Sequence, residues 1–416
     1  MGRELRLRKV DLRLDPDRYP VDGEKLDSPE KAVKYAGDIT KSMKRFHLAL
    51  LAVSAKGNVL RVILTTKHTI SAQGPGLATV LRETLLSNCV GIIVVEKDNS
   101  SEINIRDEIF AEKLVFSFRE CSLDVIDYIK TDSDGFYSSM MDKGKDLARL
   151  YINSREYMPD RIKEFHYRDN KIPDNYLKLT DEGTIPFARD IIHVTDAIDA
   201  VIEDLKYKNR EHLYVLGIKD GKPLGYSVIS VGTVNSSMAC PGDILRCLAM
   251  QGADSFIMIH NHPSSCTDPS SQDEEMTKRV LNGARLTGIK LIDHMIVGGI
   301  TGKYYSYAEE GDLSFGFKKW SETARETKDK KLINWFSTCQ YGSVKLGLLL
   351  NPAVDGNVVE RLAADENEIV SKRAKERMME ISEKAGGIKG QIEIIRQENN
   401  VAENDRIYSY GKVLKK

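Results

Sequence analysis

The chain has 416 residues, more than one hydrophobic core usually organises, so two or three domains are expected. Its 61 Lys and Arg residues against 62 Asp and Glu residues give a formal net charge of -1, which excludes a strong whole-chain attraction to nucleic acid or to acidic surfaces. No run approaches the roughly 18 apolar residues of a membrane span, so we expect no membrane segment. The six cysteines form no C-x-x-C pair, which is typical of reduced thiols in the cytoplasm.

After an N-terminal strand, two segments of the chain repeat the same order of predicted elements. The first residues alternate leucine with charge, which predicts a strand and not the apolar core of a signal peptide. From Ser28 and again from Thr195, a helix, a strand, a turn with glycine, a strand, a second helix and a buried apolar strand follow one another. His47 aligns with His212, and Ile93 with Ile257. The chain therefore looks like two copies of one α/β unit, each a mixed β-sheet flanked by helices.

The segments outside the two copies are predicted to be a linker and a helical extension. Residues 131–190 are polar, with one helical stretch near 138–156 and then a loop punctuated by proline. Beyond about residue 312 we expect helices, then NPAVDG as a breaker and a long charged helix over 358–386. The apolar stripe of that helix favours packing on its own domain and leaves self-association open. The last residues are predicted to be poorly ordered.

The stretch IMIHNHPSSCTDPSSQDEE, residues 257–275, is where the sequence predicts chemistry. Residues two apart on a strand point the same way, so His260 and His262 face one side together while Asn261 faces away. Two converging imidazoles suit a divalent metal such as zinc. Ser270 with Asp273 resembles the capping box of a following helix, which places Asp273 in the first turn, where its carboxylate can complete the set.

Three protein ligands would leave one tetrahedral position open, which is typical of a catalytic zinc ion, and we expect one zinc per chain. Other readings of an H-x-H pair fail on their further requirements. A metallo-β-lactamase motif needs Asp and His where this chain has Ser264 and Ser265. Zinc deaminases need H-x-E with a later P-C-x-x-C, and amidohydrolase barrels need a long βα series after the pair.

Taken together, the motifs between residues 193 and 299 resemble the JAMM (MPN+) metalloprotease motif in the variety carried by RadC-like proteins. The segments that carry the resemblance are HVTDAIDAVIEDLKYKNREHLYVL, VISVGTVNSSMACPGDIL, IHNHPSSCTDPSSQDEE and GIKLIDHMIVGG. The resemblance implies tandem MPN/JAB-like domains and a zinc metallopeptidase. The site residues that it implies are the metal ligands His260, His262 and Asp273 together with Ser270 and the acidic residue Glu211.

The sequence departs from the RadC-like pattern at four positions. Cys240, Gly242 and Asp243 stand where these proteins usually have His, Arg and Glu, and Ser265 replaces a usual glycine. None of these changes removes an implied ligand, but they leave the role of the helix that begins at PGDIL open.

The implied chemistry is hydrolysis of an amide bond. Water activated by the metal would pass a proton to Glu211, attack the carbonyl, and Glu211 would give the proton to the leaving nitrogen. Ser270 would donate a hydrogen bond to the developing oxyanion. Plainer interpretations remain: Ser270 as an N-cap, Glu211 as a surface glutamate and Asp273 as a partner of the helix dipole. His294, His212 and Cys266 are predicted to be packing or passive loop residues.

The first copy lacks this chemistry. Glu96 and Asp98 stand where the second copy has His260 and His262, and Phe46 stands where Glu211 should be. We therefore predict a metal-free, non-catalytic partner domain that resembles MPN- subunits.

These observations predict four regions and two competing functions. The regions are a non-catalytic domain over 1–130, a linker over 131–190, a catalytic domain over 191–311 and a helical extension over 312–416. The first function is a cytoplasmic zinc-dependent peptidase or isopeptidase that acts on a protein or peptide. The alternative is a non-proteolytic RadC-like accessory protein linked to DNA repair or mobile elements, with a structural metal. The balanced charge disfavours direct binding of nucleic acid.

Overall fold

The structure is a computed structural model, and it describes residues 6–14, 23–41, 48–71, 75–145, 147, 177–185, 194–232, 239–309, 320–339 and 341–384. The chain divides into two compact units, Met1–Phe317 and Lys318–Lys416, and each is described by itself. The first unit contains two α/β lobes, which we call the first lobe (residues 23–145) and the second lobe (residues 194–309 with two added strands).

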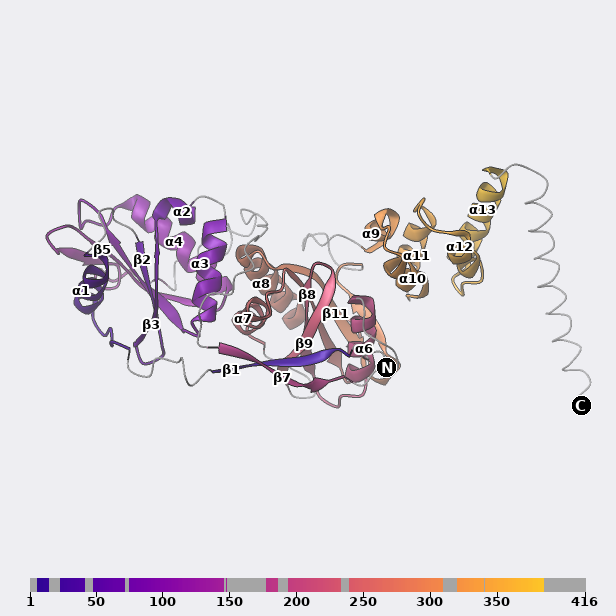
Figure 1. The fold of residues 1–416 in the computed structure, drawn as a ribbon, viewed down its shortest axis with the longest axis horizontal. Coiled ribbons are helices and arrows are strands. Elements are labelled where there is room, and N and C mark those ends of the chain that lie inside the picture. The colour runs from indigo at the N-terminus through magenta and orange to yellow at the C-terminus, as the bar shows by residue number, and fades with distance from the viewer. Residues whose placement is uncertain are drawn as a thin grey trace, which may run out of the picture. The chain divides into compact units, whose positions relative to one another are not determined.

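The second lobe is built on a seven-stranded sheet in the order β12-β11-β10-β8-β9-β1-β7 (Figure 1). The strands that follow one another within the lobe are β8 (His212–Lys219), β9 (Lys222–Val231), β10 (Ser255–His262), β11 (Lys290–Gly298) and β12 (Lys303–Ser306). Its helices are α6 (Val194–Leu205), α7 (Pro241–Gln251) and α8 (Ser271–Thr287). In β10, the residues from Phe256 to Asn261 are all buried, as a central strand covered by helices on a mixed sheet requires.

The first lobe has a five-stranded sheet in the order β3-β2-β4-β5-β6. Its strands are β2 (Leu48–Val53), β3 (Val59–Thr65), β4 (Gly91–Lys97), β5 (Asp124–Thr131) and β6 (Tyr137–Ser139), and its helices are α1 (Pro29–Thr40), α2 (Lys67–Ser71), α3 (Pro75–Leu86) and α4 (Ile105–Glu120). The order and the parallel or antiparallel sense of these strands match β9-β8-β10-β11-β12 of the second lobe.

The two lobes also agree in details of register. In each, the parallel strand pair has one register shift, and an aspartate directly after it accepts a hydrogen bond of 2.6 Å from a serine on the next strand. These pairs are Asp127 with Ser139 and Asp293 with Ser306. A β-bulge of this kind turns a side chain out of the regular alternation along a strand. The same bulge, with its bonded aspartate, is therefore present in both lobes. The fold is the predicted mixed α/β arrangement and is consistent with tandem MPN-like domains.

The strand pairing shifts the edges of the expected domains. Strand β1 (Arg8–Leu14), which the alternation of leucine and charge predicts, pairs antiparallel with β7 (Leu177–Thr184) and touches β9, so both join the sheet of the second lobe. The helix predicted near 138–156 is wrong for residues 138–145, where the end of strand β6 and a turn lie, whereas Leu147 is helical. Pairing with β5 overrides a weak local preference there. Residues 148–156 lie outside the described residues.

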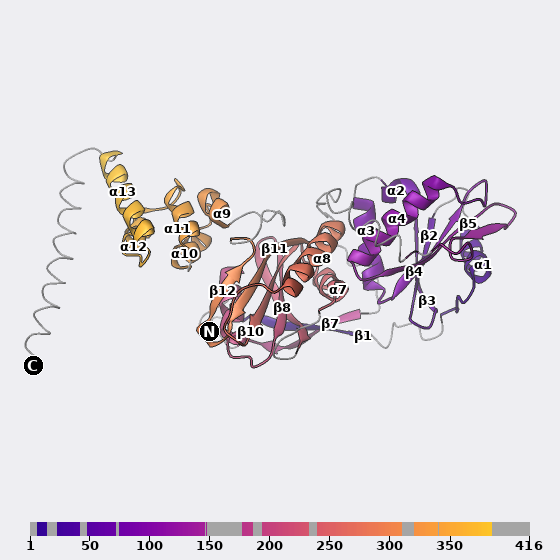
Figure 2. The ribbon, with the colours of Figure 1, turned by 180° about the vertical axis from the view of Figure 1, so that it is seen from behind.

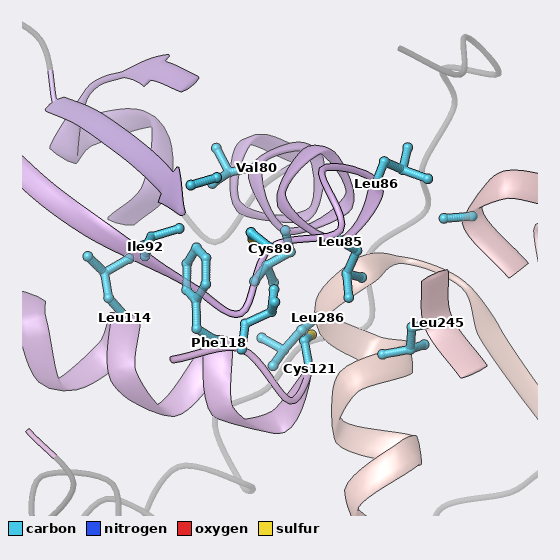
Figure 3. Close-up of a cluster of buried hydrophobic side chains, with 14 of the residues drawn as sticks. Val80, Leu85, Leu86, Cys89, Ile92, Leu114, Phe118, Cys121, Leu245 and Leu286 are labelled. Carbon is cyan, nitrogen blue, oxygen red and sulfur yellow. The ribbon is translucent and has the colours of Figure 1, made fainter. Parts of the chain in front are cut away.

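The lobes contact each other through their helices. In both views α7 and α8 lie between the second sheet and α3 of the first lobe (Figure 1 and Figure 2). One hydrophobic cluster spans the contact, and Figure 3 shows Leu85 and Cys121 of the first lobe gathered with Leu245 and Leu286 of the second. Because side chains from both lobes share one core, the free energy of folding of each lobe depends on the other.

Polar groups and close backbone contacts complete this interface. Arg82 Nε donates to the carbonyl of Thr287 at 2.7 Å, and Asn282 Nδ2 donates to Glu120 Oε2 at 3.0 Å. A Cβ on Gly242 would lie 2.6 Å from the carbonyl oxygen of Cys121. The usual arginine of RadC-like proteins therefore does not fit at position 242, because the first lobe packs there.

The second unit is helical, with α9 (Trp320–Glu326), α10 (Lys330–Thr338), α11 (Gly342–Leu349), α12 (Gly356–Ala363) and α13 (Glu368–Lys384). The rings of Trp320 and Trp335 pack edge to face with centroids 4.7 Å apart. The single long helix predicted over 358–386 is wrong, because Asn367 Oδ1 accepts from the amides of Ile369 and Val370 and starts a new helix. The residues after 384, including the predicted disordered end, lie outside the described residues. Within the described part of the chain, every helix is too short or too polar to cross a membrane.

Candidate metal centre

The three predicted metal ligands come together where β10 ends and α8 begins. His260 Nε2 lies 3.1 Å from His262 Nε2 and 3.2 Å from Asp273 Oδ1, and His262 Nε2 lies 3.5 Å from Asp273 Oδ2. One ligand atom from each residue falls within 4.8 Å of the others. Two elements suffice for this arrangement, because strand alternation aims both imidazoles to one side and the capping box keeps Asp273 in the first helical turn.

The donor atoms of this cluster fit a divalent metal. His262 Nδ1 donates to the carbonyl of Cys266 at 3.1 Å, so the lone pair of its Nε2 faces the cluster. Burial alone would raise the pKa of Asp273, but the neighbouring His260 and His262 outweigh it and lower that pKa. An ionised carboxylate and imidazole lone pairs aimed at one point repel each other unless a cation lies between them. Two nitrogens and one oxygen are a donor set that zinc accepts.

Ser270 holds Asp273 through reciprocal hydrogen bonds. The Ser270 hydroxyl donates to Asp273 Oδ2 at 2.6 Å and accepts from the Asp273 amide at 3.2 Å, while the Ser270 amide donates to Asp273 Oδ2 at 2.8 Å. This is the predicted capping box. The single hydroxyl hydrogen is used on a predicted metal ligand, so its use on an oxyanion stays a prediction.

Glu211 precedes β8, the antiparallel neighbour of β10, and lies half-buried near the cluster. Burial raises the pKa of Glu211; the nearby His260 and His262 oppose this rise, and Asp273 adds to it. Because its pKa is raised, a glutamate beside these three side chains gains and loses its proton at a pH closer to neutrality than an ordinary glutamate does.

Asn261, to which the sequence analysis gave no role, positions the segment that carries Glu211. Its side chain is fully buried, and its Oδ1 accepts from the His212 amide at 2.9 Å. Its Nδ2 donates to the carbonyls of Arg210 at 3.0 Å and Lys208 at 3.3 Å. The sequence held one signal for this: an asparagine between two residues of one face must point to the opposite, buried face of β10, where its amide needs partners.

The variant Asn261→Ala is expected to loosen residues 208–212. It leaves the amide of His212 and two carbonyls without their partner, which costs about 1–3 kcal/mol per buried unsatisfied group. Hydrogen exchange of the His212 amide should then become faster and the free energy of unfolding should fall. Asn58→Ala is the matched control, because it also removes a bond to a backbone carbonyl, that of Gly23, but in the first lobe. Unchanged exchange at His212 would contradict this role.

His294 lies behind His260. Its Nε2 is 2.9 Å from His260 Nδ1 and its Nδ1 is 2.7 Å from Thr277 Oγ1, so it contacts the ring edge of His260 that faces away from Asp273. Burial, and next the neighbouring His260, lower the pKa of His294 well below its ordinary value, so the ring is neutral. His212 and Cys266, which the sequence predicts to have no role in the chemistry, make only local contacts. The His212 ring lies beside the Arg210 carbonyl, and the exposed Cys266 contacts the His262 ring through its carbonyl and not through its thiol.

In the first lobe, two lysines form ion pairs with the carboxylates that lie at the position equivalent to the three predicted metal ligands of the second lobe. Lys130 Nζ lies 3.1 Å from Asp98 Oδ2 and 3.0 Å from Asp107 Oδ2. Lys67 Nζ lies 2.7 Å from Glu96 Oε2 and also contacts Asp107. The sequence predicts Glu96 and Asp98 at this position but gives no sign of the two lysines, which reach the carboxylates from β5 and α2. The predicted counterpart of Glu211, Phe46, lies outside the described residues.

Comparison with known proteins assigns the second lobe to a family. Residues 191–312 match the family described as "RadC-like JAB domain". The UPF0758 protein of Desulfitobacterium hafniense is 35% identical over 130 residues, 31% of this chain and 56% of that protein. The UPF0758 protein of Caldanaerobacter subterraneus is 35% identical over 122 residues, 29% and 51% of the two chains, and that of Trichormus variabilis is 42% identical over 103 residues, 24% and 42%. This chain thus spans about half the length of the curated relatives that it matches.

Proposed function

We propose, from the premise that residues 191–312 form a RadC-like JAB domain, that this chain is a zinc-dependent peptidase or isopeptidase. The substrate would be a protein or peptide, cut at an amide bond. One observation carries the proposal: His260, His262 and Asp273 converge, and the half-buried acid Glu211 lies beside them without being one of the three. A purely structural zinc site has four protein ligands and needs no neighbouring base.

The residues of the centre divide the work of hydrolysis among them. A zinc ion held by His260, His262 and Asp273 would supply Lewis acidity and lower the pKa of water to about 7. Glu211 accepts the proton of the attacking water and returns it to the leaving nitrogen. Ser270 keeps Asp273 oriented, and its hydroxyl turns to the oxyanion of the tetrahedral intermediate in the proposed second role.

The alternative is a RadC-like accessory protein without proteolytic activity, in which the metal has a structural role. The names of the relatives state no activity, so the family match is equally compatible with this function. The proposal includes a cytoplasmic setting, which suits six free cysteines, and the balanced formal charge disfavours direct contact with nucleic acid. Self-association through α13, where Ile369 is 68% exposed, belongs to the proposal as well.

Zinc content and cleavage together test the proposed function. The purified chain should bind one zinc per molecule and cleave isopeptide-linked or linear peptide substrates from a mixed library, with loss of cleavage after chelation. Zinc binding without cleavage of any substrate would favour the accessory function. Two zinc ions per chain would contradict the metal-free first lobe.

Asp273→Ala is expected to lose zinc and all hydrolysis that depends on it. The change removes the only carboxylate of the cluster. A zinc ion would then be held by two imidazoles alone and would lose both one ligand and the negative charge that offsets its positive charge. Asp268→Asn is the matched control, since the exposed Asp268 lies in the loop that precedes α8 and contacts the thiol of Cys266. Equal zinc content in the wild type and Asp273→Ala, measured by atomic emission, would remove Asp273 from the ligand set.

A further inference from the structure

We propose that His294 is a positioning residue that, together with Thr277, sets the tautomer of His260 and so directs the Nε2 lone pair of His260 to the metal. The inference rests on the proposed function only in taking the His260 cluster as a metal centre. Its basis is a line of hydrogen bonds that runs from β10 through β11 to α8.

The direction of each hydrogen bond in this line can be worked out from Thr277, because its hydroxyl has a single hydrogen to donate. Thr277 Oγ1 lies 2.5 Å from the carbonyl oxygen of Asp273, one helical turn earlier in α8. A carbonyl oxygen only accepts, so the hydroxyl hydrogen is used there. Thr277 Oγ1 must therefore accept in its contact of 2.7 Å with His294, and the hydrogen of that contact is on His294 Nδ1.

The state of His260 follows from that of His294. Both nitrogens of His294 are engaged, by a hydroxyl and by an imidazole, so neither nitrogen of this buried ring is hydrogen-bonded to an anion. A neutral His294 with its hydrogen on Nδ1 has a lone pair on Nε2, and that lone pair accepts from His260 Nδ1 at 2.9 Å. The hydrogen of His260 is then on Nδ1, and its Nε2 lone pair faces Asp273.

The surroundings hold His294 in one orientation. Thr277 is fully buried and His294 is 1% exposed, so water does not compete for these hydrogen bonds. The ring of Tyr307 stacks on His294 with centroids 5.1 Å apart and planes 3° apart, and the Tyr307 amide donates to the His294 carbonyl at 3.0 Å. A ring that is stacked on one face and bonded at both nitrogens cannot turn without breaking several contacts.

The first lobe supplies an internal comparison at the same position. In the parallel strand pairs, Val94 is opposite Tyr128 as Met258 is opposite His294. The Tyr128 hydroxyl donates to Glu96, which occupies the place of His260. In the first lobe the residue at the strand end is the anion Glu96, and the side chain behind it, Tyr128, donates a hydrogen bond. In the second lobe that residue is the imidazole of His260, which must turn a lone pair to the metal, and the side chain behind it, His294, accepts a hydrogen bond. A residue that only filled the core would not follow the chemistry of its neighbour in this way.

The line of hydrogen bonds also joins two ligands. It begins at His260 on β10 and ends at the backbone of Asp273 on α8, so each ligand is held relative to the other by His294 on β11. Metal-binding histidines usually donate their second N–H to a carboxylate or carbonyl, and loss of such a partner typically weakens metal binding 10- to 100-fold, as an order of magnitude.

Four variants test the proposal through zinc affinity measured by competition with a chelator. His294→Leu and Thr277→Val are expected to weaken zinc binding about 10- to 100-fold. His294→Gln should restore most of it, because the Gln oxygen accepts from His260 Nδ1. Tyr128→Phe, which removes the corresponding hydrogen bond in the first lobe, should leave zinc affinity unchanged. Equal losses in His294→Leu and His294→Gln would show that His294 only fills space and would overturn the proposal.

A second measurement needs none of the variants. In the zinc-loaded wild type labelled with ¹⁵N-histidine, NMR should show His260 and His294 each with its hydrogen on Nδ1. His294 with its hydrogen on Nε2 would overturn the proposal even if every variant folded poorly. If zinc binds with these tautomers but no peptide is cleaved, the proposed function fails while the assigned hydrogen-bond order stands.

Discussion

Glu211→Gln is expected to retain zinc and to lose hydrolysis by about 10²- to 10⁴-fold in kcat, the usual contribution of a general acid–base. Glutamine keeps the shape of glutamate but cannot accept and return a proton. Glu211 is not among the three clustered ligands, so zinc content should not change. Glu203→Gln is the matched control, because Glu203 lies on α6, outside the cluster, and pairs with Lys206.

The pH dependence of the reaction gives an independent check on Glu211. Only the ionised carboxylate accepts a proton, and burial raises the pKa of Glu211 above its ordinary value. The rate of the wild type should therefore fall on acidification at a pH above the ordinary titration of a glutamate, and this limb should be absent from the residual activity of Glu211→Gln. Hydrolysis by Glu211→Gln at the rate of the wild type would remove Glu211 from the mechanism.

Lys130→Met is expected to lower the free energy of unfolding by about 3–5 kcal/mol, the range for breaking a buried ion pair from one side. Lys130 and Asp107 are both almost fully buried and 3.0 Å apart, so the change leaves a buried carboxylate with Lys67 alone. Burial raises the pKa of Asp107, but the Asn104 backbone and the two lysines outweigh it and lower that pKa, which shows that the carboxylate depends on its partners. Urea denaturation followed by circular dichroism measures the loss.

The matched control for Lys130→Met is Lys143→Met, which removes an exposed lysine from the same lobe. Adding Asp107→Asn to Lys130→Met should recover part of the loss, because the uncompensated charge is then gone while an amide oxygen still faces the Asn104 amide. A loss below about 1 kcal/mol in Lys130→Met would place this pair in the range of surface ion pairs and contradict its structural role.

The contact between the lobes gives the first lobe a structural role in the second. Helix α8 carries the ligand Asp273 in its first turn, and in its second half Asn282 and the Thr287 carbonyl bind Glu120 and Arg82 of the first lobe. A rigid helix transmits the placement of one end to the other, so the first lobe supports the helix that holds the centre. The close approach at Gly242 explains one departure from the RadC-like pattern by the same contact.

The sequence alone determined the part of the centre that local rules govern. Alternation along a strand places His260 and His262 on one side, and the capping box places Asp273 in the first turn of α8. Both rules act over a few residues, so they need no knowledge of the fold. The apolar strands and the repeated order of elements were likewise predictable from periodicity.

The tertiary structure decided which residues support that centre. His294 reaches His260 only through the register of β11 on β10, and Lys67 and Lys130 reach Asp107 only when α2 and β5 are packed against α4. Strand β1 joins the second sheet through a pairing between Lys9 and Tyr226, which lie more than 200 positions apart in the sequence. Register and helix packing are set by the burial of apolar surface over the whole unit, which no window of a few residues contains.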